Sequence, residues 1–151
     1  MGSMRQELVP MKSGLLLVLM VCLAPLTALA QFTSQAAPAD AELYFISPKN
    51  GETVSGEIVV QFGLKGFGVA PAGTKHPAAG HHHLLVDLDT VPPMNQPMPA
   101  SDHIRHFGGG QTEATITLPK GEHTLQLILG DHLHVPYAPP ILSEKITITV
   151  K

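Results

Sequence analysis

The sequence predicts an all-β domain, an immunoglobulin-like β-sandwich of six to seven short antiparallel strands. Short runs of alternating apolar and polar residues follow one another from Glu42 to the C-terminus. Turn signals rich in Gly, Pro and Asn separate these runs at a spacing typical of sandwiches. No segment keeps a helical period over several turns, so we expect no helix in the domain.

The first strands are expected near the start of this domain. Residues 43–46 form a short apolar run, and the Ser-Pro-Lys-Asn-Gly sequence at 47–51 indicates a turn. Residues 57–64 alternate between apolar and polar side chains, with Val59 as the one interruption. We therefore predict two strands joined by a turn and a short connection.

The middle of the domain combines one strand with two long loops. Residues 66–80 are rich in Gly, Ala and Pro, and residues 92–99 contain four prolines, which exclude an interior strand or helix. Between them, residues 82–89 place Leu84, Val86 and Leu88 on one face. Loops of such length are usually functional or disordered. The remaining strands are expected at residues 114–118, 125–129 and 146–150.

Residues 1–30 have the pattern of a secretory signal peptide. Lys12 precedes an apolar run at 15–26, and Ala28-Leu29-Ala30 is an A-x-A cleavage site that would make Gln31 the first mature residue. The apolar run is shorter than the ~20 residues of a membrane-spanning helix. We therefore expect a periplasmic or secreted protein with no stable membrane span after cleavage.

The expected mature chain comprises a flexible tether at 31–41, rich in Ala, Ser, Thr and Pro, and the sandwich domain at 42–151. The only cysteine, Cys22, lies in the leader. Cleavage would leave no thiolate for disulfides, nucleophilic catalysis or blue-copper sites. Nucleic-acid binding is disfavoured because the net charge is −3 and no Lys/Arg cluster follows the leader.

Histidine is the most informative residue type, and seven of its nine copies gather in three short segments. If Leu84 faces the core, strand alternation gives His82 the same inward direction, while His81 and His83 point outward. If the strand at 125–129 continues, His132 and His134 also point away from the core. An i, i+2 pair on a strand brings two imidazoles close enough to share one ion.

Two such pairs predict a transition-metal site, because neutral imidazole suits copper and zinc. The candidate ligands are His81, His83, His132 and His134, followed by His103 and His106. Asp131, Asp87 or Asp89 can orient a ring through its second nitrogen. Met94 and Met98 supply soft thioethers that would favour Cu⁺, or else simply pack the proline-rich loop. His82 is expected to be a buried, hydrogen-bonded residue rather than a ligand.

Four segments together resemble a bacterial family of domains of unknown function, number 4399. They are the sequences Gly80-His-His-His-Leu-Leu-Val-Asp87, His106-Phe-Gly-Gly-Gly-Gln-Thr-Glu113, His123-Thr-Leu-Gln-Leu127 and Gly130-Asp-His-Leu-His-Val-Pro136. The resemblance extends over residues 43–151. It implies a small exported bacterial domain whose histidine-rich segments are family motifs. It implies no activity, so no catalytic residue follows from it.

Three functions are compatible with these features. The first is an exported metal-binding protein that captures, buffers or delivers copper or zinc. The second is a non-catalytic interaction or structural module of the cell envelope, with another envelope protein as its candidate partner, in which the histidines brace loops. The third, a metalloenzyme, ranks last because no catalytic motif occurs; Glu113, Glu122 and Asp131 are its candidate carboxylates. We therefore expect no enzymatic activity.

Overall fold

A computed structural model describes residue 2 and residues 32–151. The predicted signal peptide therefore lies outside the described residues. Within those residues the fold is all-β and contains no helix, which confirms the predicted class. Accordingly, the described part of the chain has no helix with the length and apolar character needed to cross a membrane.

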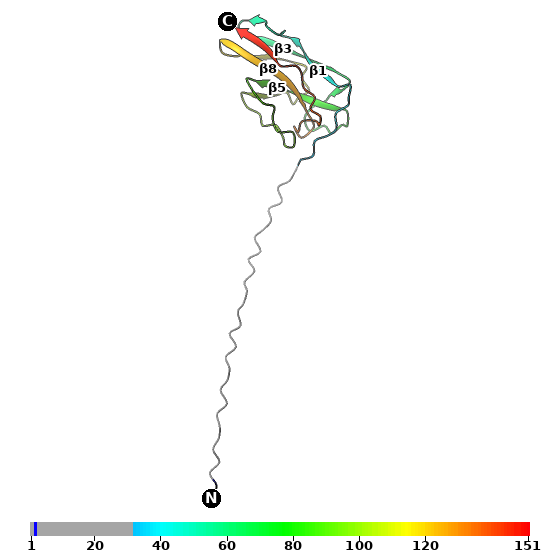
Figure 1. The fold of residues 1–151 in the computed structure, drawn as a ribbon. Helices are drawn as coiled ribbons and strands as arrows, with labels where there is room; N and C mark the ends of the chain where they lie inside the picture. The colour runs from blue at the N-terminus through cyan, green and yellow to red at the C-terminus, as the bar shows by residue number, and fades with distance from the viewer. Residues whose placement is uncertain (1, 3–31) are drawn as a thin grey trace.

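Two sheets make up the domain (Figure 1). The smaller sheet has three antiparallel strands in the order β1-β3-β7. The larger, six-stranded sheet has the order β2-β9-β8-β5-β4, with β6 paired to β5. The strands are β1 Glu42–Ser47, β2 Thr53–Val54, β3 Ile58–Lys65, β4 Gly68–Val69, β5 Ala79–Val86, β6 Ile104–His106, β7 Glu113–Ile116, β8 Gly121–Gly130 and β9 Ile146–Val150.

The strand pairing departs from the prediction in two respects. Two pairs are parallel, β2 with β9 and β4 with β5, so the strands are not all antiparallel. The described residues also contain three short strands that periodicity did not predict, β2, β4 and β6. Each of these has only two or three residues, which is too short for an alternating pattern to be recognised.

Strand β5 begins and ends earlier than the predicted 82–89 run. It ends at Val86 because Asp87 adopts a positive φ of 53°, which the extended conformation of a strand does not allow. The Asp87 carboxylate then accepts hydrogen bonds from the backbone N–H of Thr124 at 2.8 Å and from His123 Nδ1 at 2.7 Å. These contacts fix the end of β5 against β8.

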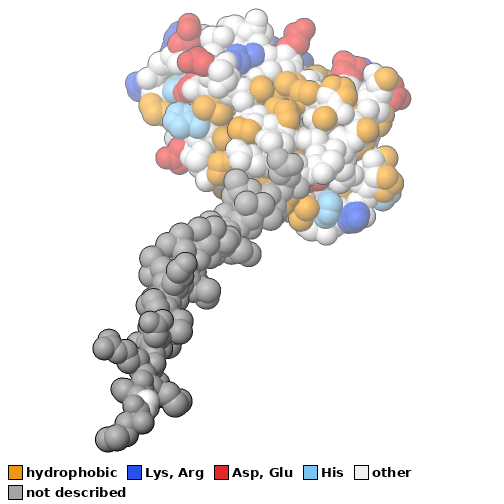
Figure 2. All heavy atoms as spheres, turned by 60° about the horizontal axis from the view of Figure 1, so that its bottom comes forward, with side chains coloured by type: hydrophobic (Ala, Val, Ile, Leu, Met, Phe, Trp, Pro, Cys, Tyr) orange, Lys and Arg blue, Asp and Glu red, His pale blue; other side chains and the backbone are white. Residues whose placement is uncertain are grey.

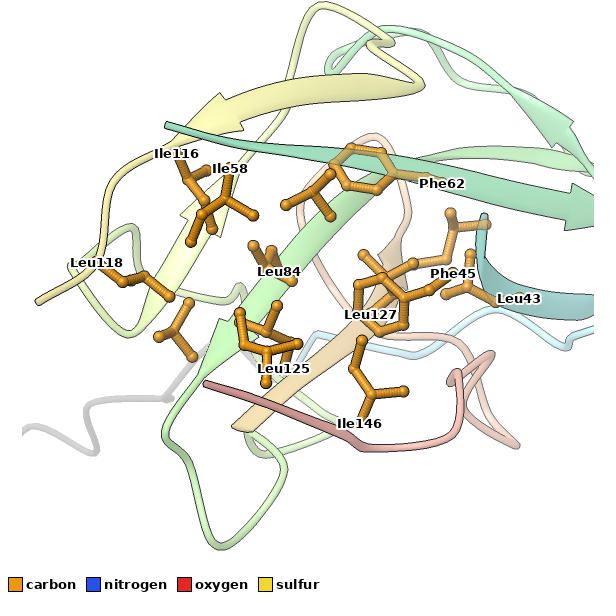
Figure 3. Packing of buried hydrophobic residues seen from close by; sticks show 14 of the residues in the cluster. Leu43, Phe45, Ile58, Phe62, Leu84, Ile116, Leu118, Leu125, Leu127 and Ile146 are labelled. Atoms are coloured by element: carbon orange, nitrogen blue, oxygen red, sulfur yellow. The ribbon is translucent and has the colours of Figure 1, made fainter. Parts of the chain in front are cut away.

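The main core lies between the two sheets. The small sheet contributes Phe45, Ile58 and Phe62, and the large sheet contributes Leu84 and Leu127, all buried (Figure 3). These residues alternate with outward-facing neighbours along each strand, as predicted from the sequence. Because apolar burial is the dominant favourable term in folding, this shared core holds the sheets face to face.

Strand β5 is buried on both faces, since all eight of its residues are buried. On its core face, the His82 ring packs on Phe62 with ring centroids 5.0 Å apart. On its other face, Leu85 joins Ile104, Ile128 and Met98 in a second, smaller apolar cluster. Met98 comes from a loop, so this smaller cluster shows that a segment outside the two sheets covers the far side of the large sheet.

Residues 32–41, for which composition predicts a tether, lie against the domain. Ala36 forms an isolated parallel bridge with Ala138, and the backbone N–H of Ala138 donates to the Gln35 carbonyl at 2.8 Å. The Ser34 hydroxyl donates to the Met94 carbonyl, and Ala37 packs on the main core. The segment therefore contacts the two loops that flank the large sheet.

The inward direction of alternate β3 residues can be tested with a neighbouring pair of valines. Val60 is fully buried, whereas Val59 is 49% exposed on the other face of the strand. Val60→Ala should lower the free energy of unfolding by about 2 kcal/mol, because methyl groups are lost from the core. Val59→Ala is the control and should change it by less than about 0.5 kcal/mol. Urea denaturation measures both; equal losses would contradict this assignment of faces.

Candidate metal centre

Three histidines converge on the outer face of the large sheet. His81 and His83 lie two residues apart on β5, so both side chains leave the same face. His106, at the end of β6, is directly opposite His83 in the antiparallel pairing of β5 with β6. Strand alternation and cross-strand register therefore place the three imidazoles together.

The three rings are close enough to share an ion. Each can offer one ring nitrogen such that all three nitrogens lie within 4.8 Å of one another. The ring centroids are 4.8 Å apart for His81 and His83, 4.9 Å for His81 and His106, and 5.1 Å for His83 and His106. A metal with bonds of ~2.0–2.1 Å to nitrogen needs somewhat closer ligands, and small rotations of the side chains provide them.

His134 adds a fourth imidazole from a different part of the chain. Its ring centroid lies 4.5 Å from that of His106, 4.9 Å from His81 and 6.0 Å from His83. We call His81, His83, His106 and His134 the histidine cluster. Four imidazoles from three chain segments match the number of ligands in a tetrahedral site.

A tight turn after β8 presents His134. The turn closes through a hydrogen bond from the His134 N–H to the Asp131 carbonyl at 2.9 Å, and His134 has a positive φ of 68°. Asp131 is buried, and its Oδ1 accepts the backbone N–H groups of Leu133 at 2.8 Å and Val135 at 2.9 Å. Gln35 Nε2 donates to the other carboxylate oxygen at 3.1 Å. The Asp131 carboxylate thus fixes the backbone that carries His134.

Two glycines make room for the imidazoles. A Cβ atom at Gly130 would lie 2.8 Å from Cε1 of His83, and one at Gly108 would lie 2.3 Å from Cε1 of His106. Real Cβ atoms do not approach other atoms so closely, so a larger residue at either position would displace a ring. The glycines beside the histidine motifs therefore have a steric role in the cluster.

The buried members of the cluster lack hydrogen-bond partners. His81 and His83 are fully buried, and among the described residues neither ring nitrogen of either side chain has a hydrogen-bond partner. Burial, reinforced by the neighbouring histidines, lowers the pKa of His81 to about 4 and that of His83 to about 2. Both rings are neutral near pH 7, the state in which imidazole binds a metal. Buried polar atoms without partners are costly, and a bound ion would satisfy them.

The cluster opens to solvent on one side. His106 is exposed and His134 is partly exposed, whereas His81 and His83 are inaccessible. The pKa of His106 is lowered mainly by burial and, to a smaller extent, by the nearby His134. On the face shown in Figure 2, histidine side chains reach the surface only at separate places. An ion would therefore reach the buried pair past the two more exposed rings.

The structure brings together four of the six predicted ligands and separates the other two. The Nδ1 of His103 lies 2.9 Å from the Val86 carbonyl oxygen, at the end of β5 away from the cluster. The Nδ1 of His132 lies 3.4 Å from Gln35 Nε2 and 3.8 Å from an Asp131 carboxylate oxygen. Strand geometry was assumed for His132 and His134, but β8 ends at Gly130 and a turn follows, so the two rings do not form an i, i+2 pair.

The predicted outward direction of His81 and His83 is correct for the sheet face but wrong for exposure. Both rings leave the face opposite the core, as alternation requires. They are nevertheless buried, because the 92–99 loop and the turn at 131–134 cover that face. The prediction for His82 is confirmed: it is buried, and its Nδ1 lies 3.2 Å from the Gln111 carbonyl oxygen.

Sequence reasoning did not identify Gly108, Gly130 and Gln35 as parts of this site. The two glycines could have been suspected from their places beside His106 and Asp131 in the motifs. Nothing in the local sequence around Gln35 indicates a contact with a residue 96 positions away.

Fold and site together define a small all-β protein with a half-buried cluster of four histidines on one face of its larger sheet. The chain belongs to the family described as "Domain of unknown function (DUF4399)", which matches residues 60–151 and so includes every histidine of the cluster. No curated protein and no solved structure matches the chain.

Stability of the metal-free protein should decrease in acid. Burial lowers the pKa of His81 and His82 to about 4 and that of His83 to about 2, from an ordinary value of 6.5. Between these values the unfolded chain binds protons that the folded chain does not. The free energy of unfolding should therefore be greatest above pH 6.5 and fall as the pH drops towards 4. Thermal unfolding followed by circular dichroism in EDTA measures this.

A His83→Gln variant is the control for the acid effect. Glutamine does not titrate, so the variant should lose less of its melting temperature between neutral and acidic pH than the wild type does. A wild-type melting temperature that stays constant as the pH falls below 6.5 would contradict the neutral burial of these rings.

Proposed function

We propose that this protein binds one transition-metal ion, copper or zinc, at His81, His83, His106 and His134, and that it serves to capture, buffer or deliver that ion. The observation that carries the proposal is the pair of fully buried imidazoles whose four nitrogens have no hydrogen-bond partner in the described part of the chain. Their nitrogens lie next to that of His106, and the His134 ring is in contact. Without a bound ion, burying these unpaired nitrogens costs free energy that an apolar or fully hydrogen-bonded arrangement would avoid.

Copper and zinc are the metals best suited to this ligand set. Neutral imidazole suits both, and the described residues contain no cysteine that would supply a thiolate. Ligands held in fixed positions favour a single binding stoichiometry, because all four rings lie on paired strands or on a hydrogen-bonded turn. We propose one ion per chain.

The alternative function, in which histidines brace loops, explains other histidines of this protein but not the cluster. The rings of His82, His103 and His123 each lie within 3.2 Å of a backbone carbonyl oxygen, of Gln111, Val86 and Pro119 respectively. His81 and His83 have no such contact. An interaction module of the cell envelope would explain the first group but not the second.

We propose a binding role without catalysis. A catalytic zinc usually has a carboxylate near its open position. Asp131 Oδ1 already accepts two backbone N–H groups, and Glu113 lies on the smaller sheet, where it accepts a hydrogen bond from Gln61. Neither carboxylate is therefore placed as a free general base beside the cluster.

We further propose that the protein is exported and that its two sheets form an immunoglobulin-like sandwich. The leader pattern at residues 1–30 supports a periplasmic or secreted location. Two mainly antiparallel sheets packed around one core support the sandwich assignment.

Calorimetric titration of the untagged protein with Cu²⁺ and Zn²⁺ tests the metal site, and residues 103–106 provide a matched pair of variants. His106 and His103 are both exposed, but only His106 belongs to the cluster. His106→Ala should weaken binding at least about tenfold, since a ligand is lost, while His103→Ala should leave it unchanged.

His134→Ala and His132→Ala form a second pair on the turn after β8. The first should weaken binding and the second should not, because the His132 ring faces Gln35 and Asp131 instead. Absence of binding in the wild-type protein, or equal losses in both members of either pair, would reject the proposed site.

A further inference from the structure

Sulfur ligands are scarce in the described chain and lie in one place. Residues 32–151 contain two methionines, Met94 and Met98, and no cysteine. Both methionines belong to the proline-rich loop that covers the outer face of the large sheet, and both pack on the smaller apolar cluster there. The thioethers and the histidine cluster therefore share one face of the sheet.

Met98 lies directly against the histidine cluster. Its Cε atom and Cε1 of His83 approach the same point above Gly130, at 3.1 Å and 2.8 Å from the position that a Cβ would take there. Nδ1 of His83 is 3.3 Å from that point. The backbone N–H of Met98 donates to the His134 carbonyl at 3.0 Å. The side chain of Met98 therefore lies close to the His83 ring, and its backbone is hydrogen-bonded to that of His134.

The position of Met98 is well determined by its surroundings. The side chain is only 5% exposed, and it packs with Leu85, Ile104 and Ile128. Met94 differs, because it is only partly buried and packs against the margin of the smaller apolar cluster. The two methionines of this loop therefore differ: the Met98 thioether lies at the histidine cluster, and the Met94 thioether lies to one side of it.

The thioether of Met98 can influence which metal the site prefers. Imidazole nitrogens bind copper and zinc alike, so they distinguish poorly between these metals. A thioether is a soft ligand that favours Cu⁺ over zinc. A buried thioether next to buried neutral imidazoles, in a site without charged ligands, suits an ion of low charge.

We propose that Met98 is a ligand of the metal centre and that the centre is a copper site which binds Cu⁺ through the Met98 sulfur together with the histidine cluster. This inference rests on the proposed function, since it requires that the cluster binds metal. It goes further by naming the metal, its oxidation state and a fifth protein residue. The Met98 methyl carbon and Cε1 of His83 both lie within 3.1 Å of the same point above Gly130, so the sulfur bonded to that methyl is in the neighbourhood of the His83 ring.

The test compares Met98→Leu with Met94→Leu, which change neighbouring thioethers to leucine at nearly constant volume. Cu⁺ affinity is measured anaerobically by competition with the chromophoric chelator bicinchoninate, and Zn²⁺ affinity by calorimetry. Met98→Leu should weaken Cu⁺ binding at least about tenfold and leave Zn²⁺ binding within about twofold. Met94→Leu should leave both affinities unchanged. Retained Zn²⁺ binding shows in the same sample that the variant is folded.

X-ray absorption at the copper edge provides a direct measurement of the ligand. The Cu⁺-loaded wild-type protein and Met94→Leu should both show a sulfur shell, and Met98→Leu should show nitrogen ligands alone. A wild-type spectrum without sulfur, or Cu⁺ affinity unchanged in Met98→Leu, would overturn the role of Met98 while leaving the histidine site intact. Failure of the wild-type protein to bind either metal would instead reject the proposed function itself, and this inference with it.

Discussion

The burial of β5 on both faces is the constraint on which the rest of this structure depends. A strand at the surface of a two-layer fold normally directs every second side chain to water. Here the alternation along β5 places His82 and Leu84 in the core between the sheets, and it places His81, His83 and Leu85 under the loops on the far side. Polar rings that cannot reach water must find another partner, and the geometry of the strand leaves them facing one another.

The loops that cover β5 complete this environment. The 92–99 loop supplies the apolar cover through Met98, and the turn at 131–134 supplies both a fourth imidazole and the carboxylate that fixes the turn. The backbone of the loop at 70–73 links the two rims of the site, because Ala72 donates to the Gly108 carbonyl and Gly73 donates to the His132 carbonyl. Tyr137 joins the segment after the turn to the start of β5 through a hydrogen bond to the Ala79 carbonyl.

Sequence reasoning reached the fold class and six of the nine strands in the described residues, because alternation is a local signal. Residues 58–64 and 146–150 show it clearly, and both are strands of the structure. It could not reach β6, which has three residues and takes its conformation from pairing with β5. For the same reason it ranked His106 below His132, since only the cross-strand register with His83 reveals that His106 belongs to the cluster. Conversely, the direction of His134 depends on a left-handed residue in a turn, which spacing along a strand does not predict.

The contacts of Gln35 show that two properties of the site depend on different parts of the sequence. Every imidazole of the cluster lies in the stretch that matches the family, whereas Gln35, which holds the Asp131 carboxylate, lies 25 residues before that stretch begins at residue 60. The imidazoles of the cluster and the closure of the turn that carries His134 are thus encoded in different parts of the chain. Substitutions before residue 60 can consequently alter the position of His134 while every imidazole of the cluster stays the same.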